Sequence, residues 1–268
     1  MKNRVYFADD LSILQKIPSS SVDLVYVDPP STKYHDESSL AWSDVGLVVS
    51  PTDTLFDNYI RSLSLRIAQF QRILKDTGTL YLQMRSVDAP YVRVTGDKIF
   101  GRQNFLNEII WAFDFGPKPK NRWPEKHENI LVWAKEKGSH IFNTDSIDRE
   151  PYVGTGLSSE KRANGKLPTD CWVQGIVHPI SHEKTGYPGQ KPLSIAKRII
   201  LASSPVGGLV VDSYAGSGTV GEACLQTNRS FILVDNNSEA IKVMRKRFSS
   251  YNTEGRSLLF LNRTKETS

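Results

Sequence analysis

The chain has 268 residues, of which 39% are hydrophobic and 24% are charged, the proportions of an ordinary soluble globular protein. This composition excludes collagen-like, fibrous and wholly disordered chains. The two widely separated cysteines, Cys171 and Cys224, exclude a disulfide scaffold and a paired-cysteine zinc site. No apolar run approaches the roughly 20 residues of a membrane helix, and the N-terminal residues lack the apolar core of a secretory signal. We therefore expect a cytoplasmic protein without a membrane partner. The net charge of +5 is compatible with a polyanionic partner but does not require one.

Short apolar runs alternate with longer helical patterns along the chain, which is typical of a parallel sheet covered by helices. The segment Asp76-Thr77-Gly78 is predicted to end a helix and turn into the next strand, and Ser238 is predicted to cap a later helix. The predicted strands are 5–8, 24–27, 79–83, 107–112, 130–134, 209–212 and 230–234. The predicted helices are 55–74, 192–203, 220–226 and 238–248.

Residues 143–187 interrupt this alternation. They are rich in glycine, serine and proline and show no sustained apolar period. We interpret them as an irregular lobe inserted into an α/β domain, because segments of this length in compact domains are usually either functional or disordered. A long floppy connection is the alternative.

The strongest local motif is the glycine-rich run from Asp212 to Gly221, which links a predicted strand to a predicted helix. Gly216, Gly218 and Gly221 fit the dinucleotide-binding pattern GxGxxG, and Asp235 ends the next predicted strand, where a carboxylate would bind ribose hydroxyls. A nicotinamide dinucleotide is therefore one candidate ligand. Asp212, directly before the glycines, favours a cationic ligand instead, and S-adenosylmethionine carries an ammonium group, a sulfonium and a ribose. A tight turn without a ligand is the third interpretation.

A second motif, Asp28-Pro29-Pro30, follows the predicted strand 24–27. Proline fixes φ and lacks an N–H group, so the turn is stiff and its carbonyl oxygens remain free to accept hydrogen bonds. Together with the carboxylate of Asp28, these oxygens form a site that suits an exocyclic amino group, which offers two N–H donors. Asp-Pro-Pro alone is a common turn, but its combination with the glycine-rich run favours a functional role.

Taken together, these motifs resemble the β-class amino-methylating DNA methyltransferases nearly from end to end. Residues 8–11 resemble the early Gly-Asp-x-Leu element of that family, and residues 21–30 resemble its catalytic strand. Residues 186–192 resemble the Tyr-Pro-Thr-Gln-Lys-Pro element, and residues 212–219 resemble the cofactor loop. The catalytic motif precedes the cofactor loop, which is the order of the β-class permutation.

The resemblance implies an α/β fold with a seven-stranded, mostly parallel, Rossmann-like sheet, circularly permuted so that 5–8 lies beside 230–234. It implies a catalytic half in 1–142, a target-recognition lobe in 143–187 and a cofactor-binding half in 188–268. S-adenosylmethionine is the implied cofactor, with Asp9 at its adenine and Asp235 at its ribose. The implied cofactor-binding residues are Asp9, Gln190, Lys191, Asp212, Ala215, Gly216, Ser217, Gly218, Thr219, Asp235 and Asn236.

The implied reaction is methyl transfer to the exocyclic amino group of a base flipped out of double-stranded DNA, with adenine N6 favoured over cytosine N4. RNA is an alternative substrate. The implied catalytic residues are Asp28, Pro29, Pro30 and Ser31. No metal is implied, and a homodimer and a restriction endonuclease are further partners that occur in the family.

Two positions depart from the family pattern. Ser31 replaces an aromatic residue that stacks on the base, and such stacking contributes roughly 1–3 kcal/mol. Tyr34 or Trp42 in the following segment could supply the ring, and Gly189 stands where threonine is usual. A degenerate subunit that binds cofactor or DNA without turnover is therefore an alternative.

The basic stretch at residues 118–126 is predicted to contact DNA phosphates. The alternative is a solvated surface loop. Lys126 also begins a Lys-His-Glu element that the family shares, for which the sequence indicates no role. The predicted DNA-binding residues are Lys118, Lys120, Arg122, Trp123 and Lys126.

Overall fold

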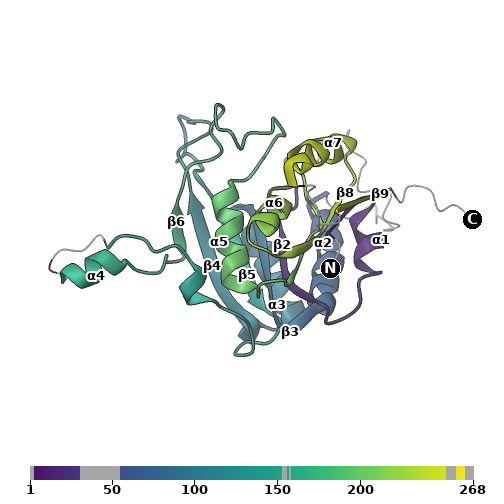
Figure 1. Ribbon diagram of the computed structural model, residues 1–268, viewed down its shortest axis with the longest axis horizontal. Coiled ribbons are helices and arrows are strands. Elements are labelled where there is room, and N and C mark those ends of the chain that lie inside the picture. Colours follow the sequence, from purple (N-terminus) through teal and green to yellow (C-terminus); the bar gives the residue numbers. More distant parts are fainter. Residues whose placement is uncertain (1–2, 31–54, 153–155, 157, 252–257, 263–268) are drawn as a thin grey trace, which may run out of the picture.

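The structure is a computed structural model that describes residues 3–30, 55–152, 156, 158–251 and 258–262. Within these residues, nine strands form one mixed sheet in the order β6-β4-β5-β3-β2-β7-β8-β1-β9 (Figure 1). Strand β5 is antiparallel to β3 and β4, and the other neighbouring pairs are parallel. The strands are β1 (Asn3–Phe7), β2 (Val22–Val27), β3 (Leu74–Arg85), β4 (Phe105–Ala112), β5 (His127–Ala134), β6 (Cys171–Val173), β7 (Leu209–Asp212), β8 (Ser230–Asp235) and β9 (Leu258–Asn262).

The predicted mostly parallel sheet is confirmed, and all seven predicted strands belong to it. Strands β6 and β9 extend it at its two edges. Neither edge strand was predicted, because neither shows the apolar pattern of a buried strand. Only the middle residue of β6 is buried, and β9 has no buried residue.

Helices cover both faces of the sheet, so the domain has three layers (Figure 1). Residues of α1, α2 and α3 pack on one face, and residues of α5, α6 and α7 pack on the other. Strand β2 is buried along its whole length between these layers, which explains its continuous apolar run. Among the described residues, no helix is long and apolar enough to cross a membrane. The helices are α1 (Asp10–Leu14), α2 (Leu55–Ile73), α3 (Ala89–Phe100), α4 (Ser159–Asn164), α5 (Leu193–Ser203), α6 (Thr219–Gln226) and α7 (Ser238–Arg247).

The predicted permutation is confirmed by the pairing of β1 with β8. These strands come from opposite ends of the chain and run parallel, with Phe7 opposite Asp235. The side-chain oxygen of Asn3 accepts a hydrogen bond from the backbone N–H of Phe231 (3.1 Å), and Ala8 donates its N–H to the carbonyl of Asp235 (3.2 Å). This pairing places the residues after β1 at the same sheet edge as the end of β8.

Two local predictions were wrong. The cap of α7 is Asn237, whose side chain accepts from the N–H of Glu239 (2.9 Å), because Asn237 has an extended backbone and Ser238 is already helical. Residues 76–78 lie inside β3, since α2 ends at Ile73 and the strand begins at the next residue. The register of β2 on β3 shifts there, so an irregular strand segment takes the place of the predicted turn.

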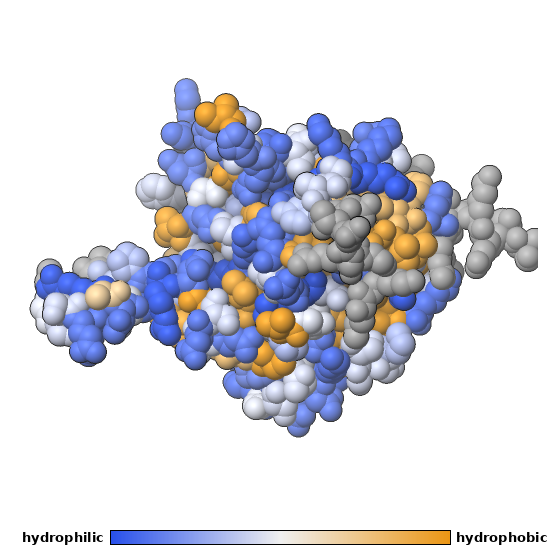
Figure 2. Space-filling view, viewed as in Figure 1, coloured by the Kyte–Doolittle hydropathy of each residue, from blue (hydrophilic) through white to orange (hydrophobic). Residues whose placement is uncertain are grey.

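The segment 143–187 has more regular structure than its composition indicates. Its β6 pairs in parallel with β4, and Trp172 is buried in the core beneath α5. An isolated bridge between Glu150 and Lys166 joins the two sides of an arm that carries α4. The arm projects from the domain (Figure 1). Its visible surface is mostly hydrophilic (Figure 2).

Close packing between α3 and β5 leads to a stability prediction. A Cβ atom at Gly96 would lie 2.4 Å from Cζ2 of Trp133. Trp133 is fully buried, and its indole N–H donates to Asp97 (2.9 Å). Gly96→Ala should lower the free energy of unfolding by about 1–3 kcal/mol in urea titrations, because overpacking outweighs the gain of up to ~1 kcal/mol in helix propensity.

The matched control is Gly175→Ala, because a Cβ there meets no atom within 4 Å. It should change the free energy of unfolding by no more than about 0.5 kcal/mol. Equal stability of the two variants would contradict the packing argument.

Candidate active site

Four aspartates gather at one edge of the sheet because the strands that precede them are parallel. Asp9 follows β1, Asp28 follows β2, and Asp212 and Asp235 end β7 and β8. The carboxyl ends of parallel strands meet at the same edge, which is where open α/β sheets bind ligands. All four residues line one cleft of about 1210 Å³. The structure thus brings the two sequence motifs together in a single site.

Most of the predicted catalytic and cofactor-binding residues contribute to this cleft. Gly218 does not line it, and Ser31, Tyr34 and Trp42 lie outside the described residues. The predicted residues that line the cleft are Asp9, Asp28, Pro29, Pro30, Gln190, Lys191, Asp212, Ala215, Gly216, Ser217, Thr219, Asp235 and Asn236.

The glycine-rich loop between β7 and α6 requires two of its glycines. Gly216 and Gly218 have φ values of +48° and +78°, a left-handed conformation that favours glycine. A Cβ at Gly218 would also lie 2.7 Å from Cγ of Met244. The carboxylate of Asp235 accepts the N–H of Gly216 (2.7 Å) and that of Asn237 (2.8 Å), so Asp235 fixes the loop as well as facing the cleft.

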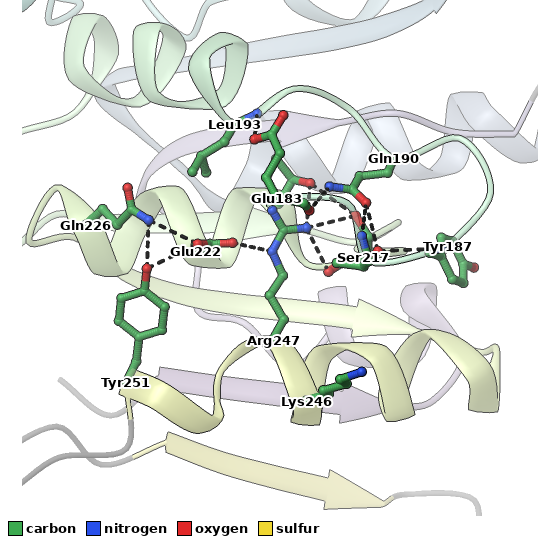
Figure 3. Close-up of polar contacts among 12 residues, drawn as sticks. Glu183, Tyr187, Gln190, Leu193, Ser217, Glu222, Gln226, Lys246, Arg247 and Tyr251 are labelled. Carbon is green, nitrogen blue, oxygen red and sulfur yellow. Dashed lines mark hydrogen bonds and ion pairs between the residues drawn. The ribbon is translucent and has the colours of Figure 1, made fainter. Parts of the chain in front are cut away.

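Arg247, from the end of α7, holds the other side of this loop and was missed by the sequence analysis (Figure 3). It donates to the carbonyl and hydroxyl of Ser217 (3.2 Å each) and to the hydroxyl of Thr219 (3.0 Å). Its remaining partner is the carboxylate of Glu222 in α6. The hydroxyl of Thr219 donates in turn to the carbonyl of Lys191 (3.2 Å), which joins the loop to the segment before α5.

Gln190 shapes the segment before α5 rather than pointing freely into the cleft (Figure 3). Its side-chain amide donates to the carbonyl of Glu183 (2.6 Å) and accepts from the N–H and hydroxyl of Thr185 (2.8 Å each). Gly189 has a φ of +70°, so this turn suits the glycine that replaces the usual threonine.

The side chain of Lys191 extends to Asp28. Its Nζ lies 3.1 Å from Oδ2 of Asp28, and 3.0 and 2.8 Å from the two carboxylate oxygens of Glu128 in β5. Glu128 also accepts from Gln83 in β3 (2.6 Å), whose side-chain oxygen accepts from the hydroxyl of Tyr26 in β2 (2.6 Å). Glu128 belongs to the Lys-His-Glu element, and the structure places it at the site.

The basic stretch forms the connection between β4 and β5, and Phe115, Gly116 and Pro117 of that connection line the cleft. Two of its cations have protein partners. Lys126 donates to the carbonyl of Gly116 (3.1 Å), and Arg122 lies 3.5 Å from Glu125. The predicted DNA-binding residues with exposed side chains are Lys118, Lys120, Arg122 and Trp123.

The comparison with known proteins identifies the family. Residues 22–246 match a family model described as DNA methylase. The chain belongs to this family of amino-methylating DNA methyltransferases. The protein is therefore an S-adenosylmethionine-dependent DNA methyltransferase, as the resemblance implied, and the family match favours this cofactor over a nicotinamide dinucleotide.

One similar sequence is the DNA adenine methyltransferase YhdJ of Escherichia coli K12, 31% identical over 93% of this chain and 85% of YhdJ. The PvuII DNA methyltransferase, a cytosine-N4-specific enzyme, has the same fold with a TM-score of 0.72 and 15% identity over 95% of this chain and 89% of that one. TTHA0409 of Thermus thermophilus, a putative DNA modification methylase solved with S-adenosyl-L-methionine, has a TM-score of 0.62 and 21% identity over 97% of this chain and 99% of that one.

The donor set of the cleft fits this cofactor. Asp212 and Asp235 present carboxylates that can accept from an ammonium group and from ribose hydroxyls. The buried hydroxyl of Ser213, which also lines the cleft, has no hydrogen-bond partner among the described residues, and a polar ligand would satisfy it.

Burial at this edge raises the pKa of two carboxyl groups of the methyltransferase, those of Asp212 and Asp235. It raises the pKa of Asp212 to about 8, and the nearby Asp28 and Asp235 add to this, against the hydrogen bond that Asp212 accepts from the N–H of Tyr214. Burial likewise raises the pKa of Asp235, although its two backbone hydrogen bonds lower it. A cationic ligand would compensate this accumulation of negative charge.

The raised pKa of Asp212 predicts a gain in stability on Asp212→Asn in the ligand-free protein. Since the folded chain holds this proton more tightly than the unfolded chain, the wild type loses stability as the pH rises from about 4 to about 8. The melting-temperature advantage of Asp212→Asn should grow over that range and then stay constant in thermal unfolding scans.

Asp114→Asn is the matched control, because the Asp114 side chain is 94% exposed. It should show no such pH-dependent gain. An advantage of Asp212→Asn that is the same at every pH would contradict the assignment of the effect to ionisation.

Proposed function

We propose that this methyltransferase methylates adenine N6 in double-stranded DNA and that Asp28 is its catalytic carboxylate. The observation that carries the proposal is the position of Asp28 at the end of β2, in the same cleft as the glycine-rich loop. The Asp-Pro-Pro motif leans towards adenine, and YhdJ, an adenine methyltransferase, is 31% identical. The neighbour with cytosine-N4 specificity shares the fold at only 15% identity.

Asp28 and the carbonyl of Pro29 accept the two N–H groups of a base flipped out of the duplex. The amino nitrogen is a poor nucleophile because its lone pair is conjugated with the ring. Hydrogen bonds to both N–H groups favour a pyramidal nitrogen whose lone pair can attack. The cofactor supplies the methyl group from its sulfonium. As the new N–C bond forms, positive charge develops on nitrogen, and Asp28 stabilises this charge and accepts the proton that nitrogen loses.

The aspartates at the strand ends and the glycine-rich loop would hold the cofactor beside this nitrogen. Asp9 would contact the adenine and Asp235 the ribose hydroxyls, while residues 215–219 would surround the methionine end near Asp212. Asn236 follows Asp235 at the same edge. Alignment of the methyl group with the attacking nitrogen supplies much of the rate.

The test is nucleoside mass spectrometry of unmethylated DNA incubated with the protein and methyl-labelled S-adenosylmethionine. Wild type should produce labelled N6-methyladenine, and Asp28→Asn should lower the rate by at least about 10²-fold with a cofactor Kd close to that of wild type. Labelled N4-methylcytosine would overturn the base assignment. Activity retained by Asp28→Asn would overturn the catalytic role. If wild type forms no labelled nucleoside but still binds the cofactor, the protein is a degenerate subunit.

We also propose that the connection between β4 and β5 holds the DNA backbone beside the cleft. The exposed side chains of its Lys120 and Arg122 support this proposal. Lys120→Ala and Arg122→Ala should each reduce the slope of log K against log salt by about one. Fluorescence anisotropy across a salt series measures this slope.

Lys16→Ala is the control, since Lys16 is exposed in the turn after α1 and does not line the cleft. It should leave the salt slope unchanged. A slope that responds equally to all three substitutions would indicate a general charge effect and no specific contact.

A further inference from the structure

The catalytic carboxylate is held by a mostly buried lysine that also contacts a second carboxylate. The Lys191 side chain is 18% exposed, Glu128 is 19% exposed and Asp28 is 33% exposed. Lys191 contacts Oδ2 of Asp28, whereas no described residue contacts Oδ1. Among the described residues, one carboxylate oxygen of Asp28 thus has an ionic partner, and the other has no hydrogen-bond or ion-pair partner.

The partners of Lys191 come from a rigid part of the fold. Glu128, Gln83 and Tyr26 lie on the neighbouring strands β5, β3 and β2 and form a continuous hydrogen-bonded row. The ring of Trp111 in β4 lies 5.8 Å from Nζ of Lys191. Because each member is fixed by a partner on the sheet, the ammonium group has little freedom to leave Asp28.

We propose that Lys191 and Glu128 form a positioning pair that holds Asp28 in one orientation and sets the charge around it for accepting the amino N–H. This inference rests on the proposed role of Asp28. Lys191 keeps Asp28 ionised. Glu128 holds Lys191 in place, and its negative charge partly offsets the electrostatic effect of Lys191 on Asp28. Neither residue needs to touch the base.

The charges around Asp28 have opposite effects on its pKa. Burial raises this pKa to about 6, Lys191 lowers it and Glu128 raises it. Among the described residues, the other ionisable groups that interact with Asp28 are Tyr26, Tyr59 and Asp212. Both tyrosines have raised pKa values, and burial raises that of Asp212 to about 8, so these three groups are largely neutral when Asp28 titrates.

The experiment compares Lys191→Met, Glu128→Gln and Lys75→Met. Lys75 contacts Asp23 (2.7 Å) at the opposite end of β2, so its substitution removes a comparable lysine–aspartate pair away from the cleft. Two readouts are used. The first is the pH profile of single-turnover methyl transfer, and the second is the ¹³Cγ titration of Asp28 in the full-length protein, assigned with Asp28→Asn.

In wild type both midpoints should lie near pH 6, because Asp28 must be ionised to accept the N–H. Lys191→Met should raise both midpoints by about one unit or more, and Glu128→Gln should lower both. Lys75→Met should leave them unchanged. Lys191→Arg, which keeps the charge, should restore most of the wild-type midpoint with a lower rate, since the guanidinium has a different shape.

Unchanged Asp28 midpoints in both Lys191→Met and Glu128→Gln would overturn the positioning pair, as would shifts in the same direction. The ¹³Cγ titration does not depend on turnover. Opposite shifts in a protein that methylates no DNA would therefore support the pair while the proposed function fails. If the variants methylate DNA but their Asp28 midpoints do not shift, the proposed function stands and the positioning pair fails.

Discussion

The whole site depends on one constraint, which is that parallel strands bring their carboxyl ends to the same edge. Four aspartates meet there, and the burial of Asp212 beside Asp28 and Asp235 is costly because like charges lie close together. The fold offsets this repulsion with the ammonium of Lys191 on Asp28 and the backbone N–H groups that Asp235 accepts. Asp212 keeps a raised pKa and remains the least compensated member. A cleft of this charge suits a cationic cofactor and an amino group rich in donors.

The sequence predicts the framework well because its information is local there. Each central strand is a short apolar run, and the two motifs consist of consecutive residues at strand ends. The pairing of β1 with β8 followed from the order of motifs in the resembling family, because no periodic pattern indicates which strands are neighbours. The cap of α7 and the start of β3 were predicted wrongly because several adjacent residues have similar propensities, and tertiary packing decides between them.

The contacts that organise the site could not be predicted in the same way. Lys191 and Glu128 are 63 positions apart, and Arg247 is 30 positions from Ser217. No local spacing relates such residues, since they meet only once the sheet and α7 are in place. Sequence analysis assigned Lys191 to the cofactor because of its motif, whereas its ammonium contacts Asp28. A charged residue within a recognised motif therefore predicts which site it belongs to more reliably than it predicts which group its side chain contacts.

The hydrogen bond from Thr219 to the carbonyl of Lys191 joins the two halves of the site. Through this bond, the glycine-rich loop and the lysine that contacts Asp28 belong to one connected unit. Any ordering of the loop by one ligand also orders the acceptor for the other. By thermodynamic reciprocity, if the cofactor strengthens retention of a base at Asp28, that base strengthens cofactor binding by the same factor.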